Sequence, residues 1–343
     1  MGKPRFAAYA AILGVVLLWG SAASVGRYLG DAATPLELAV WRLLLGLTLL
    51  LAAQTIIGGL RGGRRHSDAG HRATTAGGGQ AASPGTRHAD RSAHSVARLA
   101  PVWLAGVLGY GVMIWLFFAA ARLTLASHLV LILSMAPICT LLISRLSGGD
   151  GRSRDLPPAL LSLAGATVMA APAVSGTGAS LTGDALAILA MLAFSAYTVL
   201  TSRYGASMPA LRLNIHGMSA GLLFLWAMMA ATQQRLWPRG FASQEQWLAI
   251  GYLGAAATGL AYVLYALALA RLPMARVVPF IYLQPIVGVL LSALWLGERL
   301  TWNVGLGMVA IMGGLLWNHA LRSRTDLTSR TNCASPESKG HNH

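Results

Sequence analysis

The chain has 343 residues, of which 55% are hydrophobic and 11% are charged, and its formal net charge is +15. A typical soluble domain is about 25% charged. The composition therefore excludes a soluble globular domain, a disordered chain, a nucleic-acid-binding domain and a secreted disulfide scaffold, and it indicates an all-α polytopic membrane protein.

Apolar stretches of about 18 residues or more without Lys, Arg, Asp or Glu are candidates to cross a bilayer. In chain order, ten transmembrane helices are predicted: 6–26, 36–60, 99–121, 123–144, 156–183, 185–202, 213–234, 246–270, 277–297 and 300–321. The first continues through Trp19 without a convincing cleavage site, so it is predicted to be a retained helix rather than a signal peptide. An even number of spans puts both termini on the same side.

Basic residues predict the orientation of these spans, because cytoplasmic loops carry an excess of Lys and Arg. Of the 26 basic residues, 20 fall on the side of the termini, five fall on the other side, and Arg42 lies within a span. Both termini are therefore predicted to be cytoplasmic. The 2 lysines among these residues indicate a GC-rich coding sequence, hence a bacterium and its inner (plasma) membrane.

Two segments have the composition of disordered chain: a cytoplasmic loop at 58–98 and a cytoplasmic tail at 322–343. Both are polar and contain too few large apolar residues to fold alone. The histidines of the loop have no compact ligand spacing, and Cys139 and Cys333 fit neither a disulfide nor a zinc motif. Neither a metal nor a cofactor is expected.

An internal repeat is visible when Val107–Ser144 is compared with Ala256–Leu294. Each segment has an Ala-Arg-Leu connector (121–123 and 270–272) followed by a proline within the next apolar helix (Pro137 and Pro285), and the prolines are 148 positions apart. We predict two five-helix repeats, residues 1–172 and 181–321; because five is odd, the second is inverted. The alternative is chance similarity between Ala/Leu-rich helices.

Three segments carry a family resemblance: LLWGSAASVGRYL at 17–29, TPLELAVWRLLLG at 34–46, and the block at 265–314 with Pro285 and Leu-Gly-Glu-Arg at 296–299. Through them the chain resembles the EamA-like branch of the drug/metabolite transporter superfamily over residues 6–320, except for the long loop. The first half lacks the Gly-Glu-Arg helix end. The resemblance implies ten helices, a central substrate cavity and transport, often export, of amino acids or other small metabolites.

Ionisable residues inside a bilayer are costly and are therefore functional candidates. Arg42 can hold a substrate carboxylate through two parallel hydrogen bonds; alternatively it snorkels to the interface or pairs with Glu37. His128 can relay a proton; the alternative is a satisfied polar contact between helices. Gln284 precedes Pro285, and a proline frees a backbone carbonyl that needs a partner or lines a polar cavity.

The other candidate substrate-binding residues are expected to line the cavity. They are Trp19, Ser21, Tyr110, Trp115, Ser134, Tyr197, Tyr262 and Tyr265, with Pro137 and Pro285 as hinges or helix breaks. For the aromatic residues the alternative is helix packing. We identify no acidic residue in mid-span and no catalytic residue.

These observations predict a secondary transporter of small metabolites such as amino acids, with export as the expected direction and alternating access as the mechanism. A nucleotide-sugar or other organic-anion carrier is one alternative, and a non-transporting membrane scaffold is another. An enzyme is not expected, because HExxH, GxSxG and close carboxylate pairs are missing from the spans. The expected partners are a small-molecule substrate and the lipid bilayer, with a proton as candidate coupling ion, a homodimer left open, and no nucleic acid.

Overall fold

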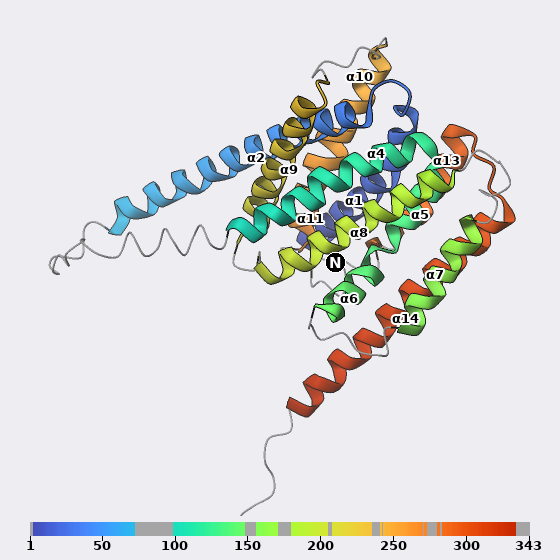
Figure 1. The fold of residues 1–343 in the computed structure, drawn as a ribbon. Helices are drawn as coiled ribbons and strands as arrows, with labels where there is room; N and C mark the ends of the chain where they lie inside the picture. The colour runs from blue at the N-terminus through green and yellow to red at the C-terminus, as the bar shows by residue number, and fades with distance from the viewer. Residues whose placement is uncertain are drawn as a thin grey trace, which may run out of the picture.

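The computed structural model describes residues 3–72, 99–147, 156–170, 180–204, 208–234, 241, 243–269, 271–272, 280–281 and 283–333. These residues form a helical bundle without strands (Figure 1). Eight helices are long and apolar enough to cross a membrane: Phe6–Tyr28, Pro35–Ile56, Leu99–Leu123, Ala126–Leu146, Leu181–Tyr204, Ala210–Ala231, Gln244–Tyr265 and Trp302–Leu321. The all-helical, multi-pass membrane architecture is thereby confirmed.

The helices are named as in Figure 1. They are α1 (Lys3–Tyr28), α2 (Pro35–Arg72), α4 (Met113–Leu123), α5 (Ala126–Ser134), α6 (Ala136–Leu146), α7 (Leu156–Ala170), α8 (Leu181–Tyr204), α9 (Ala210–Ala231), α10 (Gln244–Gly251), α11 (Ala261–Leu269), α13 (Gln284–Leu296) and α14 (Trp302–Cys333), with π-helical segments η1 (Val107–Val112) and η4 (Tyr252–Leu260). The predicted spans 156–183 and 277–297 are described only in part, as α7 and α13. Ten crossing helices therefore remain a prediction.

Two helices run further than the hydropathy pattern predicts. Helix α2 continues to Arg72 and α14 to Cys333, beyond the predicted spans. The disorder predicted for residues 58–98 and 322–343 remains a prediction. Neither extension contains a proline, which would interrupt the helix. Residues 73–98 and 334–343 lie outside the described part of the chain.

Small residues let the helices approach closely where they cross. Gly106, just before η1, faces Gly217 of α9 so closely that an added Cβ would lie 2.5 Å from the Gly217 carbonyl oxygen. Gly46 of α2 similarly faces the Gly254 carbonyl and Thr258 of η4. In a bilayer, such close contacts replace the hydrophobic effect as the source of helix association.

Several features recur in the two halves at an offset of 148 or 149 positions. Helix α5 ends before Met135 and α13 begins after Leu283, so the two interruptions are 148 positions apart. At the crossing of α7 and α14, the Ser162 hydroxyl donates to the Ile311 carbonyl at 3.3 Å, and these residues are 149 positions apart. A shift of 148 positions also places η1 within η4, and these segments pack against α9 and α2 respectively.

Both candidate hinge prolines lie in the first turn of a helix. Pro137 is the second residue of α6 and Pro285 is the second residue of α13. Proline is tolerated there because the first N–H groups of a helix have no intrahelical partner. The helices are thus interrupted beside both prolines, and hinge motion remains a prediction.

Candidate substrate site

Five of the predicted aromatic residues form one continuous set of ring contacts, which we call the aromatic cluster: Trp19, Tyr110, Tyr197, Tyr262 and Tyr265. The Trp19 ring centroid lies 5.5 Å from those of Tyr262 and Tyr265. The Tyr110 centroid lies 6.0 Å from that of Tyr262 and 5.3 Å from that of Tyr197. The cluster therefore joins α1 and η1 of the first half to α8 and α11 of the second.

Tyr110 is the most buried member of the aromatic cluster, with 2% of its surface exposed. Its hydroxyl donates to Asn214 Oδ1 at 2.6 Å and lies 3.2 Å from the Tyr197 hydroxyl. Gly217 and Gly221 of α9 leave room for it, since a Cβ at either position would lie within 2.8 Å of a Tyr110 side-chain atom. The Gly217-xxx-Gly221 pattern thus positions a candidate binding residue, and Asn214 is a partner that the sequence analysis missed.

We expect Tyr110→Phe to lower the free energy of unfolding by about 1–3 kcal/mol, because it leaves the Oδ1 of half-buried Asn214 without its hydroxyl donor. Thermal unfolding of the purified protein measures this effect. Tyr204→Phe is the matched control, since Tyr204 is 47% exposed and its change should be near neutral. Equal melting temperatures for both variants would contradict a stabilising hydrogen bond between Tyr110 and Asn214.

Arg42 contacts the helical segment that leads into Tyr262, because its hydrogen-bond partner Thr258 lies four residues before that tyrosine. Its Nε donates to the Thr258 hydroxyl at 3.0 Å, and its guanidinium carbon lies 5.2 Å from the Phe117 ring centroid. Glu37 does not pair with it but accepts the Thr34 backbone N–H at 2.8 Å. Among the described residues, no carboxylate lies within ion-pair distance of Arg42.

The π-helical geometry of η4 positions Thr258, the hydrogen-bond partner of Arg42. The Thr258 hydroxyl donates to the Leu253 carbonyl five residues earlier, at 2.8 Å, and so its lone pairs are left for the guanidinium. π-bulges frequently occur at functional sites. Thr258 was not predicted as a site residue, although the repeat offset of 148 aligns it with Tyr110 and was available as a signal.

The remaining candidates lie in different surroundings. The Ser21 hydroxyl is 2.5 Å from that of Tyr252, which the sequence analysis did not single out. Ser134 donates to the Leu131 carbonyl within its own helix, and half-buried Trp115 packs against the apolar core. Gln284 begins α13, and Gly20 of α1 packs against its backbone carbonyl.

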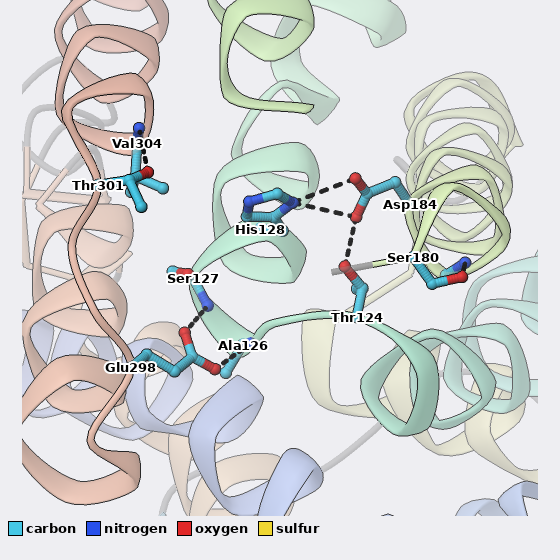
Figure 2. Close-up of polar contacts among 10 residues, drawn as sticks. Thr124, Ala126, Ser127, His128, Ser180, Asp184, Glu298, Thr301 and Val304 are labelled. Atoms are coloured by element: carbon cyan, nitrogen blue, oxygen red, sulfur yellow. Dashed lines mark hydrogen bonds and ion pairs between the residues drawn. The ribbon is translucent and has the colours of Figure 1, made fainter. Parts of the chain in front are cut away.

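His128 belongs to a separate polar cluster at the start of α5 (Figure 2). Its Nδ1 lies 3.1 Å from Asp184 Oδ2, and the Thr124 hydroxyl donates to Asp184 Oδ1 at 2.6 Å. Asp184 lies between the predicted spans 156–183 and 185–202, where a carboxylate is ordinarily solvated. It is buried because α8 begins against the α4–α5 connection, a tertiary contact that single-helix hydropathy does not reveal.

No group of three or more potential metal ligands occurs among the described residues. The polar groups of the aromatic cluster and of Arg42 are hydroxyl, amide and guanidinium groups. They suit recognition of an organic molecule that carries both a charged group and an apolar or cationic part.

Comparison with known proteins supports the sequence resemblance. Residues 181–319 match the model of the EamA-like transporter family. A solved structure titled "Crystal structure of protein" shares 20% identity and a TM-score of 0.58, with 94% of this chain and 98% of that chain covered. This likeness shows the fold alone. A search of curated proteins finds no match.

Proposed function

We propose, from the premise that residues 181–319 belong to the EamA-like transporter family, that this membrane transporter is a secondary carrier. It exports small metabolites such as amino acids across the plasma membrane by alternating access, with both termini in the cytoplasm. The excess of basic residues on the side of the termini supports this orientation.

The observation that carries the proposal is a candidate site composed of residues from both halves of the chain. Arg42, Trp19 and Tyr110 come from the first half, and Tyr197, Tyr262 and Tyr265 from the second. A carrier that works by alternating access needs a site at the interface of its two repeats, which rock against each other. The features that recur at 148 or 149 positions support the inverted repeat on which this mechanism depends.

The chemistry of the site favours a zwitterion over a polyanion. The Arg42 guanidinium can bind a carboxylate, and the faces of tyrosine and tryptophan rings attract an ammonium group. A nucleotide sugar carries several phosphate charges, which one arginine does not balance. Small amino-acid-like metabolites therefore fit the described residues better than nucleotide sugars do.

The test is efflux from proteoliposomes preloaded with a panel of amino acids, amines, organic anions and nucleotide sugars, followed by mass spectrometry of the retained compounds. We expect selective loss of amino-acid-like compounds with the wild-type protein, a smaller loss with Gln284→Ala, and no selective loss from protein-free liposomes. Selective loss of nucleotide sugars would support the organic-anion alternative. A folded, inserted protein that releases none of the panel would support the scaffold alternative.

A further inference from the structure

The first turn of α5 is held by two carboxylates that come from the second half of the chain (Figure 2). Asp184 of α8 binds His128 and Thr124. Glu298, between α13 and α14, accepts the backbone N–H groups of Ala126 at 2.7 Å and Ser127 at 3.1 Å. We call this set of contacts the α5 clamp. It is a polar connection between the two halves that does not involve the aromatic cluster.

The His128–Asp184 pair is buried, with 1% of His128 and 4% of Asp184 exposed. A buried carboxylate needs hydrogen-bond donors and a balancing charge. The Thr124 hydroxyl supplies one donor, and the histidine Nδ1–H supplies a second. Only the protonated imidazole also balances the charge, so loss of that proton leaves an uncompensated negative charge inside the clamp and weakens the closed arrangement.

Helix α5 is a short, buried segment that is interrupted at both ends. Thr124 and Leu125 before it are extended, with ψ of 173° and 146°, and Met135 interrupts the helix after nine residues. Gly183 allows the first turn of α8 to touch the connection, since an added Cβ would lie 2.8 Å from the Thr124 backbone nitrogen. The clamp therefore joins a short, doubly interrupted helix to the start of another.

We propose that His128 and Asp184 bind a proton from the water at this end of the molecule, and that protonation of the pair stabilises closure of the α5 end. A proton passes from water to the imidazole as this end closes, and returns to water as the end opens. Under the proposed orientation the α5 end faces outward. The link to transport rests on the proposed function; the link between protonation and closure does not.

Among the described residues, His128 and Asp184 form an ion pair only with each other, and Arg122 lies 3.9 Å from Asp31. From the elements packed against α5, the described groups at this end are Arg27 of α1, Arg122 of α4, Asp184 of α8, and Glu298 and Arg299 between α13 and α14. Arg27 donates to the backbone carbonyls of Ala121 and Arg122.

Closure can be measured without any substrate. In a Cys139→Ala, Cys333→Ser background, a cysteine replaces Ser127, which is 1% exposed, and in a parallel protein a cysteine replaces Leu300, which is 50% exposed. The ratio of their maleimide labelling rates cancels the intrinsic effect of pH on thiol reactivity. One linked proton changes the closed-to-open ratio by up to about tenfold per pH unit. We expect the labelling rate at position 127, divided by the rate at position 300, to rise by up to about tenfold per pH unit.

Two variants test whether His128 and Asp184 cause the pH dependence of the labelling ratio. His128→Gln keeps an N–H donor toward Asp184 but does not titrate, and Asp184→Asn keeps an acceptor for Thr124 but removes the charge. We expect the labelling ratio to be independent of pH in both. The proposal is overturned if the ratio does not change with pH when His128 and Asp184 are intact, or if the pH response persists in His128→Gln.

Transport assays then separate the two proposals. Amino-acid exchange across proteoliposomes can be measured at equal pH on both sides, so it needs no proton gradient. We expect the exchange rate of the wild-type protein to depend on the pH of the solution that the α5 end faces, and the exchange rate of His128→Gln to be independent of that pH. No exchange by the wild-type protein would contradict the proposed function while the labelling assay still decides proton-linked closure. A pH-dependent exchange rate that persists in His128→Gln would contradict the role of the His128–Asp184 pair alone.

Discussion

The Gly106→Ala variant is expected to lose about 1–3 kcal/mol or more of unfolding free energy, because overpacking a tight contact forces the backbone to move. An alanine Cβ at this position would lie 2.5 Å from the Gly217 carbonyl oxygen and 2.6 Å from the Gly217 Cα. Both atoms belong to the backbone of α9, so no side-chain rotation relieves the overlap. The helices themselves must separate.

Separation of η1 from α9 would also displace residues of the candidate site. Gly106 immediately precedes η1, and η1 holds Tyr110 against Gly217 and Gly221. We therefore expect Gly106→Ala to lower both the melting temperature of the purified protein and its transport rate. The two losses have one cause, the displacement of η1 from α9.

Gly251→Ala is the matched control, because an added Cβ there meets no atom within 4 Å. Gly251 is the last residue of α10, and alanine in a helix is more stable than glycine by about 0.5–1 kcal/mol. The melting temperature of Gly251→Ala should be equal to that of the wild-type protein or slightly higher. If Gly106→Ala and Gly251→Ala have the same melting temperature, the close approach of η1 and α9 does not contribute to stability.

The membrane helices could be predicted from sequence because crossing a bilayer requires a long uncharged stretch. The predicted span 6–26 corresponds to the helix Phe6–Tyr28 in the structure, and the predicted span 99–121 corresponds to Leu99–Leu123. The extension of α2 to Arg72 could not be predicted in this way. Hydropathy reports where a helix leaves the bilayer, and it contains no information on where the helix ends in water.

The candidate site was predictable in its residue types but less so in its contacts. Aromatic residues and Arg42 were identifiable because they are polar groups within apolar spans. The partners Asn214, Thr258 and Asp184 depend on which helices lie side by side, and π-helical segments such as η4 have no clear composition signal. The repeat offset provided one usable constraint, since it aligns Tyr110 with Thr258.

Arg42→Gln is expected to reduce transport of a carboxylate-bearing substrate by about 10–150-fold in kcat/KM. The estimate converts the loss of one charge-assisted hydrogen bond, about 1.5–3 kcal/mol, into a ratio of rates. Glutamine keeps an N–H group that can reach toward the Thr258 hydroxyl but has no charge for a carboxylate. An amide-capped analogue of the same substrate should be transported equally by the wild-type protein and the variant.

Two further variants separate substrate contact from helix packing. Arg42→Lys keeps the charge but loses the planar pair of donors, so an intermediate loss is expected. Thr258→Val removes the hydroxyl that orients Arg42 and leaves the charge in place, so its loss should also be partial. Tyr204→Phe is the reference variant. Tyr204 is exposed and far from Arg42 in the sequence, so we expect its substitution to leave transport unchanged.

The comparison between carboxylate and amide-capped substrates is decisive because a structural role for Arg42 is independent of the substrate's charge. If Arg42 only stabilises the contact of α2 with η4, then Arg42→Gln lowers the melting temperature and slows both substrates equally. If it binds the carboxylate, the loss follows the substrate charge and the melting temperature changes little. The cation–π contacts with Phe117 and Phe118 hold the guanidinium without neutralising it, which leaves its charge for a ligand.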